Sequence, residues 1–185
     1  MSEVQEMNHY AVPMGIRHHF DLDFDIEESS QFSNFFSILR EAGPEDVVYV
    51  HINCNGGSID TTVQIVNAIK NSSATVITSA EGMVASGAAI IFFSGDAFQI
   101  GDHCQFLVHT ASGGGPGKIS DTMSFVSATT QRIQDLYADV FGGFLTEEEL
   151  DSIRRGEEFY LTSEQVKERI QEFMAQQEEE NEESE

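Results

Sequence analysis

Tryptophan is absent from this sequence, and cysteine and proline are rare. The 185 residues include three prolines and two cysteines, Cys54 and Cys104. The two cysteines form no C-x-x-C pair, and no two histidines are spaced as on one face of a helix. We therefore expect no metal site and no cofactor. So few cysteines fit a reducing, cytoplasmic setting.

Basic residues are also scarce. Nine Lys and Arg stand against 32 Asp and Glu, which gives a formal net charge of −23. Nucleic acids and anionic membrane surfaces attract Lys and Arg patches, so we expect neither as a partner. The same charge makes copies of the chain repel one another, so self-association would need apolar interfaces that outweigh it.

Long apolar runs are missing as well. The longest apolar-rich window, residues 83–93, is too short to span a bilayer and is interrupted by Ser86 and Gly87. Residues 1–15 show no basic region followed by an apolar run, so we expect a flexible arm and no signal peptide. Six of the last eight residues are Glu, which predicts a disordered acidic tail at residues 176–185. Residues 16–175 then form one domain.

Strand and helix patterns alternate along this domain. Expected strands cover residues 20–26, 47–52, 74–79, 99–100 and 106–108, and expected helices cover 32–39, 63–69, 119–141, 145–154 and 164–174. Residues 88–93 read as a short helical or buried run. Turns are expected at 53–58 and 81–86, and a glycine-rich loop at 113–117. The alternation predicts an α/β fold with a largely parallel sheet.

Ser86 is a candidate nucleophile. It lies at a predicted strand-to-helix turn among small residues, which leave room for a substrate carbonyl. A helix that begins just after Ser86 points backbone N–H groups at a developing oxyanion. A serine that merely caps a buried helix would give the same pattern.

Gly56 and Gly57 follow a predicted strand and precede a helix. Paired glycines there can expose N–H groups to an anion or let a peptide backbone lie close, although an ordinary tight turn looks the same. The segment matches neither glycine-rich phosphate-binding motif.

His109 is the candidate base among six histidines. It ends the apolar strand 106–108 and precedes the glycine-rich loop, with apolar residues behind it and open space in front. A structural histidine at the rim of the core is the alternative. An acidic partner could be Glu157 or Glu158, which precede an aromatic strand, but acidic residues are too abundant here to single one out.

Taken together, these segments resemble the proteolytic subunit of the ATP-dependent Clp protease. Residues 53–58 (N-C-N-G-G-S) are similar to that family's Asn-Ser-Pro-Gly-Gly segment, and residues 82–86 to its Gly-x-Ala-Ala-Ser turn. Residues 108–114 resemble its Ile-His-Gln-Pro-x-Gly-Gly segment. From His109 the family pattern runs without a gap to Glu158, where the family has its triad Asp. The resemblance covers roughly residues 20 to 168.

The resemblance implies a ClpP/crotonase-like spiral of ββα units with a protruding handle helix. It also implies a serine endopeptidase with Ser86 as nucleophile, His109 as base and Glu158 as the residue that orients His109. The backbone N–H groups of Gly57 and Gly87 would form the oxyanion hole.

The family also implies an assembly. We expect a homo-oligomeric ring, heptameric and stacked, that degrades unfolded polypeptides, with an AAA+ unfoldase as a candidate partner. This sequence departs from the family at Glu158, where the family has Asp, and Glu157 is a second candidate for the same role. It also departs at His51, where the family often has an aromatic residue that helps to dock the unfoldase. The alternative is a catalytically inactive ring subunit with an assembly or regulatory role. Acyl-CoA chemistry, as in crotonases, ranks last because no basic residues are placed to meet the CoA phosphates.

Overall fold

A computed structural model describes residues 15–110 and 119–183, of which 119–129 and 174–183 are described by their backbone alone. The arm predicted at residues 1–15 lies outside this range except for Gly15. The predicted glycine-rich loop at 113–117 lies outside it entirely.

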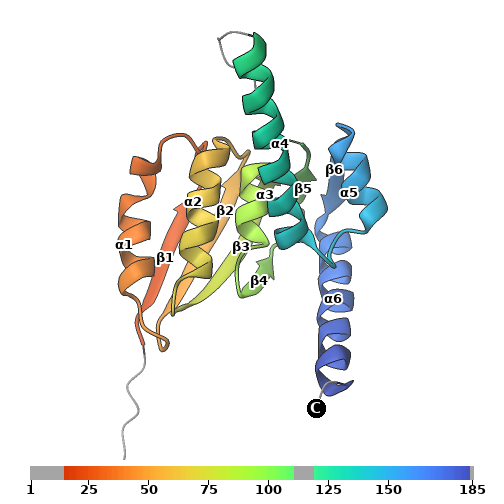
Figure 1. Ribbon diagram of the computed structural model, residues 1–185. Coiled ribbons are helices and arrows are strands. Elements are labelled where there is room, and N and C mark those ends of the chain that lie inside the picture. Colours follow the sequence, from red (N-terminus) through yellow and green to blue (C-terminus); the bar gives the residue numbers. More distant parts are fainter. Residues whose placement is uncertain (1–14, 111–118, 184–185) are drawn as a thin grey trace, which may run out of the picture.

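Strands and helices alternate along the described chain (Figure 1). The strands are β1 (Arg17–Leu22), β2 (Val47–Cys54), β3 (Thr75–Ala85), β4 (Ala97–Ile100), β5 (Gln105–Val108) and β6 (Phe159–Thr162). The helices are α1 (Ser33–Glu41), α2 (Ile59–Lys70), α3 (Gly87–Phe92), α4 (Ile119–Phe141), α5 (Glu147–Arg154) and α6 (Ser163–Glu183), with a 3₁₀ turn η1 (Ser29–Phe32) before α1. The predicted α/β class is confirmed.

The strands form one sheet in the order β1-β2-β3-β5-β6, and β4 pairs with β3 beside β5. All pairings are parallel except that of β6 with β5, which is antiparallel. Strand β3 is the centre of this arrangement. Its residues 77–80 pair with β4 and its residues 83–85 pair with β5, while β2 lies along its other side.

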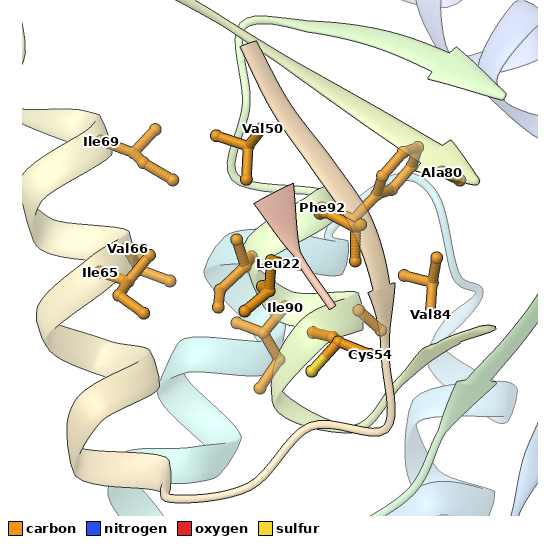
Figure 2. Close-up of a cluster of buried hydrophobic side chains, with 14 of the residues drawn as sticks. Leu22, Val50, Cys54, Ile65, Val66, Ile69, Ala80, Val84, Ile90 and Phe92 are labelled. Atoms are coloured by element: carbon orange, nitrogen blue, oxygen red, sulfur yellow. The ribbon is translucent and has the colours of Figure 1, made fainter. Parts of the chain in front are cut away.

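One face of the sheet is covered by helices, with α1, α2 and α3 side by side across it in Figure 1. Strand β2 shows why. Its side chains alternate, and Val48, Val50, Ile52 and Cys54 are buried under the helices. Figure 2 shows part of this core, where side chains of α2 and α3 meet those of the strands. Each fully buried Val or Ile contributes about 1.5–3 kcal/mol relative to exposure.

Several element boundaries differ from the sequence-based prediction. The strand predicted at 20–26 is observed as β1 at Arg17–Leu22, and the helix predicted at 63–69 is observed as α2 at Ile59–Lys70. Two further differences are larger. Strand β3 continues to Ala85 through the turn predicted at 81–86. Its backbone stays satisfied there because residues 83–85 pair with β5 and the Met83 N–H donates to Asn53 Oδ1 at 3.0 Å. Helix α6 continues to Glu183, past the end predicted near residue 174 and into the predicted disordered tail. Gln and Glu, which dominate that stretch, are good helix formers.

Helix α4 matches the helix predicted at 119–141. In Figure 1 it crosses the covered side of the sheet and extends well beyond the sheet edge. None of the helices within the described ranges is long and apolar enough to cross a membrane.

Candidate active site

The candidate site lies at one edge of the sheet. The parallel strands β2, β3 and β5 all end there, so the residues that follow them are brought together. Gly57 follows β2, Ser86 follows β3 and His109 follows β5. Strand β6 runs the other way and pairs Phe159 with Val108, so Glu158 lies beside His109 at the backbone level. The fold thus delivers each predicted site residue to the same edge.

A pocket of about 410 Å³ opens at this edge. Four of the five predicted site residues line it, namely Ser86, His109, Gly57 and Gly87. The lining is completed by Ser58, Ile59, Ile90 and Tyr137.

Ser86 occupies a sharp turn between β3 and α3. Its φ of 56° lies in the left-handed region, which is uncommon for a residue with a side chain and occurs often at functional sites. The turn is held because the Ser86 N–H donates to the Leu107 carbonyl at 2.8 Å and the Ser86 carbonyl accepts from Ala89 N–H at 3.0 Å. Ser86 occupies the N-cap position of α3, but its hydroxyl makes no capping hydrogen bond. The helix-cap explanation of this serine is therefore wrong.

Gly56 and Gly57 are required by close packing. Both have positive φ, at 97° and 148°. A Cβ on Gly57 would lie 2.0 Å from the Ile26 carbonyl oxygen, and one on Gly56 would lie 2.7 Å from the Ser86 Cβ. Hydrogen bonds fix the loop to Ile26, whose N–H donates to the Gly56 carbonyl and whose carbonyl accepts from Ser58 N–H. The loop is therefore held tightly against the serine turn.

Gly87 lies against the same loop. A Cβ on Gly87 would lie 2.5 Å from Thr62 Oγ1 and 3.6 Å from the Gly57 nitrogen. As the first residue of α3, Gly87 has no acceptor for its N–H within the helix. The Gly57 backbone thus lies against Gly87, beside Ser86, and the N–H groups of both glycines are candidate donors to one oxyanion.

His109 is half-buried at the rim of the pocket. Its backbone carbonyl accepts a hydrogen bond from the Tyr137 hydroxyl at 2.5 Å. Within residues 15–110 and 119–183, no hydrogen bond joins the His109 imidazole to the Ser86 hydroxyl or to a carboxylate. The two residues are brought together as lining of the same pocket.

The two candidate acids are exposed and point elsewhere. Glu158 Oε2 accepts from the Tyr160 hydroxyl at 2.9 Å, and this hydrogen bond raises the pKa of Tyr160. Glu157 Oε2 accepts from Ser152 Oγ at 2.6 Å, toward α5. Neither carboxylate lines the pocket. The structure places Glu158 beside His109 along the chain but does not bring its carboxylate to the imidazole.

Tyr137 is the pocket residue that sequence reasoning missed. It lies on α4 and is 6% exposed, and burial raises the pKa of its phenol to about 12. Ile133, Tyr137 and Phe141 follow helical spacing, which is typical of an apolar core stripe. The one signal was the hydroxyl, since a buried Tyr usually has a hydrogen-bond partner.

No group of three or more His, Cys, Asp or Glu side chains among the described residues could hold a metal ion. The pocket instead combines a hydroxyl, an imidazole and the backbone of two glycines on an α/β fold. A hydroxyl, an imidazole and backbone N–H groups are among the groups that acyl transfer through a serine uses.

Comparison with known proteins assigns the family. The Clp protease family model matches residues 23–168, which is most of the chain. This chain belongs to the Clp protease family, and the predicted resemblance is confirmed. The ATP-dependent Clp protease proteolytic subunit of Nephroselmis olivacea is 26% identical over 117 residues. That match covers 62% of this chain and 56% of the relative, so this chain spans little more than half of the curated relative's length.

Proposed function

We propose that this chain is a serine endopeptidase subunit that cleaves unfolded polypeptides through a triad of Ser86, His109 and Glu158. The observation that carries the proposal is the single pocket that Ser86 and His109 share with Gly57 and Gly87. A serine that only stabilised a helix would need none of these neighbours.

In this mechanism, Ser86 Oγ attacks the peptide carbonyl while the His109 imidazole takes the hydroxyl proton. The carbonyl oxygen becomes an oxyanion, and the N–H groups of Gly57 and Gly87 stabilise it by about 3 kcal/mol each. His109 then gives the proton to the leaving amine, and water releases the acyl group in a second round of the same steps.

Glu158 would complete the triad by turning from Tyr160 toward His109. The antiparallel pairing of Phe159 with Val108 supports this role. Glu158 precedes Phe159 and His109 follows Val108, so the two residues lie opposite each other just beyond the paired strands. A carboxylate at that position would orient the imidazole and stabilise the imidazolium. The extra methylene of Glu relative to Asp lengthens its reach along this edge.

The proposal includes assembly into a stacked, heptameric homo-oligomeric ring in the cytoplasm, with an AAA+ unfoldase as a candidate partner. Helix α4, which extends beyond the sheet edge, is the element we assign to contact between rings (Figure 1). The Nephroselmis olivacea relative is the proteolytic subunit of an ATP-dependent protease, which supports a protein that works with an ATPase.

The test is labelling by a fluorophosphonate probe together with hydrolysis of a fluorogenic peptide. We expect Ser86→Ala to abolish both, and Ser30→Ala, at an exposed serine far along the chain, to leave both unchanged. Labelling that survives in Ser86→Ala would exclude Ser86 as the nucleophile.

A second candidate is a catalytically inactive ring subunit with an assembly or regulatory role. The hydrogen bond of Glu158 to Tyr160 favours it, because that bond directs the carboxylate away from His109. Absence of probe labelling in the wild-type protein between about pH 6 and pH 9, which brackets the usual pKa of His, would support this candidate.

A further inference from the structure

Tyr137 is the one tyrosine among the described residues that line the pocket, and its hydroxyl contacts the backbone of His109, the proposed base. It donates to the carbonyl oxygen of His109 at 2.5 Å. Because burial raises the phenol pKa to about 12, the hydroxyl keeps its proton across the range in which peptidases work and stays a donor.

His109 lies where regular strand pairing stops. Val108, the residue before it, is fixed by its pairing with Phe159 across β5 and β6. The His109 carbonyl lies one residue beyond this pair, and the Tyr137 hydroxyl donates to it. The base therefore has a strand on its N-terminal side and a helix side chain at its carbonyl.

Tyr137 itself is held firmly. Its ring packs edge-on against Phe141 with ring centroids 5.4 Å apart, and Phe141 in turn packs against Phe93 at 5.4 Å. Phe141 is fully buried. Such packing fixes the position of the hydroxyl relative to the sheet, so the carbonyl that it binds is fixed as well.

We propose that Tyr137 is a positioning residue for the reaction: its hydroxyl sets the peptide plane of His109 and thereby the distance from the imidazole to the Ser86 hydroxyl. This inference rests on the proposed function of the pocket. Tyr137 transfers no proton and does not contact the reacting atoms. It acts through His109.

The test compares Tyr137→Phe with Tyr49→Phe, which removes a phenol hydroxyl from β2 outside the pocket. We expect Tyr137→Phe to lower kcat and the fluorophosphonate labelling rate about ten-fold, since a small misplacement of a catalytic group is costly. KM should stay within about two-fold, because a positioning residue does not touch substrate. Tyr49→Phe should leave all three values unchanged. Thermal melts will check that each variant is folded at the assay temperature.

A wild-type kcat in Tyr137→Phe would overturn the proposal. So would a raised KM with unchanged kcat, which would mean that the phenol contacts substrate.

A second measurement, which needs no peptide hydrolysis, separates this inference from the proposed function. The rate at which diethyl pyrocarbonate modifies His109, measured by mass spectrometry relative to exposed His103, should change at least about two-fold in Tyr137→Phe but not in Tyr49→Phe. If that rate changes while the wild-type protein shows no probe labelling, the proposed function fails, and Tyr137 positions His109 without serving that reaction. An unchanged rate overturns the positioning role itself.

Discussion

Gly57 illustrates how little space surrounds the candidate site. A methyl group on Gly57 would overlap the Ile26 carbonyl, and the backbone there has a positive φ. We expect Gly57→Ala to lower the free energy of unfolding by about 2–4 kcal/mol, because backbone strain and a steric clash add. Urea denaturation measures this. Probe labelling should fall too, since the loop carries a proposed oxyanion donor.

Gly156→Ala is the matched control for stability. Gly156 also has a positive φ, of 96°, but beyond its chain neighbours no atom lies within 4 Å of the position that a methyl group would take. The substitution should cost about 1 kcal/mol for the backbone alone. Equal costs at Gly57 and Gly156 would mean that the Gly57 loop relaxes freely, which would contradict the tight packing described above.

Glu158 and Glu157 are the two candidates for the third residue of the proposed triad. We expect Glu158→Gln to lower kcat by at least about 100-fold, because the amide cannot stabilise the imidazolium. Glu157→Gln should change kcat by less than about three-fold, since its carboxylate binds Ser152. Steady-state hydrolysis of a fluorogenic peptide distinguishes them. The reverse pattern would assign the triad to Glu157.

Some of the candidate site could be predicted from sequence for a physical reason. Ser86, His109 and Gly57 each follow a predicted strand, and the resemblance to the Clp protease family assigned them to one site. They meet because parallel strands end at a common edge. The direction of the Glu158 side chain and the contact of Tyr137 could not be predicted. Both depend on tertiary packing of side chains that no local pattern specifies.

Among the elements, the start of α5 is determined by residues close in sequence, whereas the end of β3 is determined by a contact with a distant strand. A helix was predicted at 145–154, and in the structure it begins with a full capping box in which the side chains of Thr146 and Glu149 each accept from the other's N–H. Capping depends on neighbours in sequence, so sequence reports it well. The turn predicted at residues 81–86 is confined to Ser86, because β3 runs to Ala85 and a non-local pairing with β5 keeps residues 83–85 extended.

Glu149 also ties α5 to α6. Its carboxylate binds both guanidinium nitrogens of Arg169, at 2.8 and 2.9 Å, and this ion pair lowers the pKa of Glu149 below its ordinary value of 4.5. A carboxyl group with a lowered folded-state pKa stabilises the protein above its unfolded pKa, and that stability is lost as the pH falls through the folded pKa.

We therefore expect the free energy of unfolding to fall below about pH 4.5 more steeply in the wild-type protein than in Glu149→Gln. Urea denaturation across this pH range measures the difference. Glu148→Gln, at an exposed neighbour, should retain the wild-type slope. Identical slopes for wild type and Glu149→Gln would show that the ion pair adds no stability.

For the whole molecule, the net charge of −23 opposes the proposed ring. Raising the salt concentration from about 0.01 M to about 0.1 M shortens the screening length from about 30 Å to about 10 Å, which weakens repulsion between subunits. We expect the native mass, measured by analytical ultracentrifugation, to shift toward larger assemblies over this range. Dissociation on adding salt would instead indicate an interface held by ion pairs.

Strand β3 has a consequence for how heat inactivates the protein. It pairs with β2, β4 and β5 and carries Ser86 at its end. A residue on a surface loop can be displaced while the rest of the protein stays folded, but the turn of Ser86, the proposed nucleophile, cannot open unless the centre of the sheet opens with it. Loss of probe labelling and loss of circular dichroism should therefore occur at the same temperature. Damage to this protein by heat would be all or nothing, with no population of folded but inactive subunits.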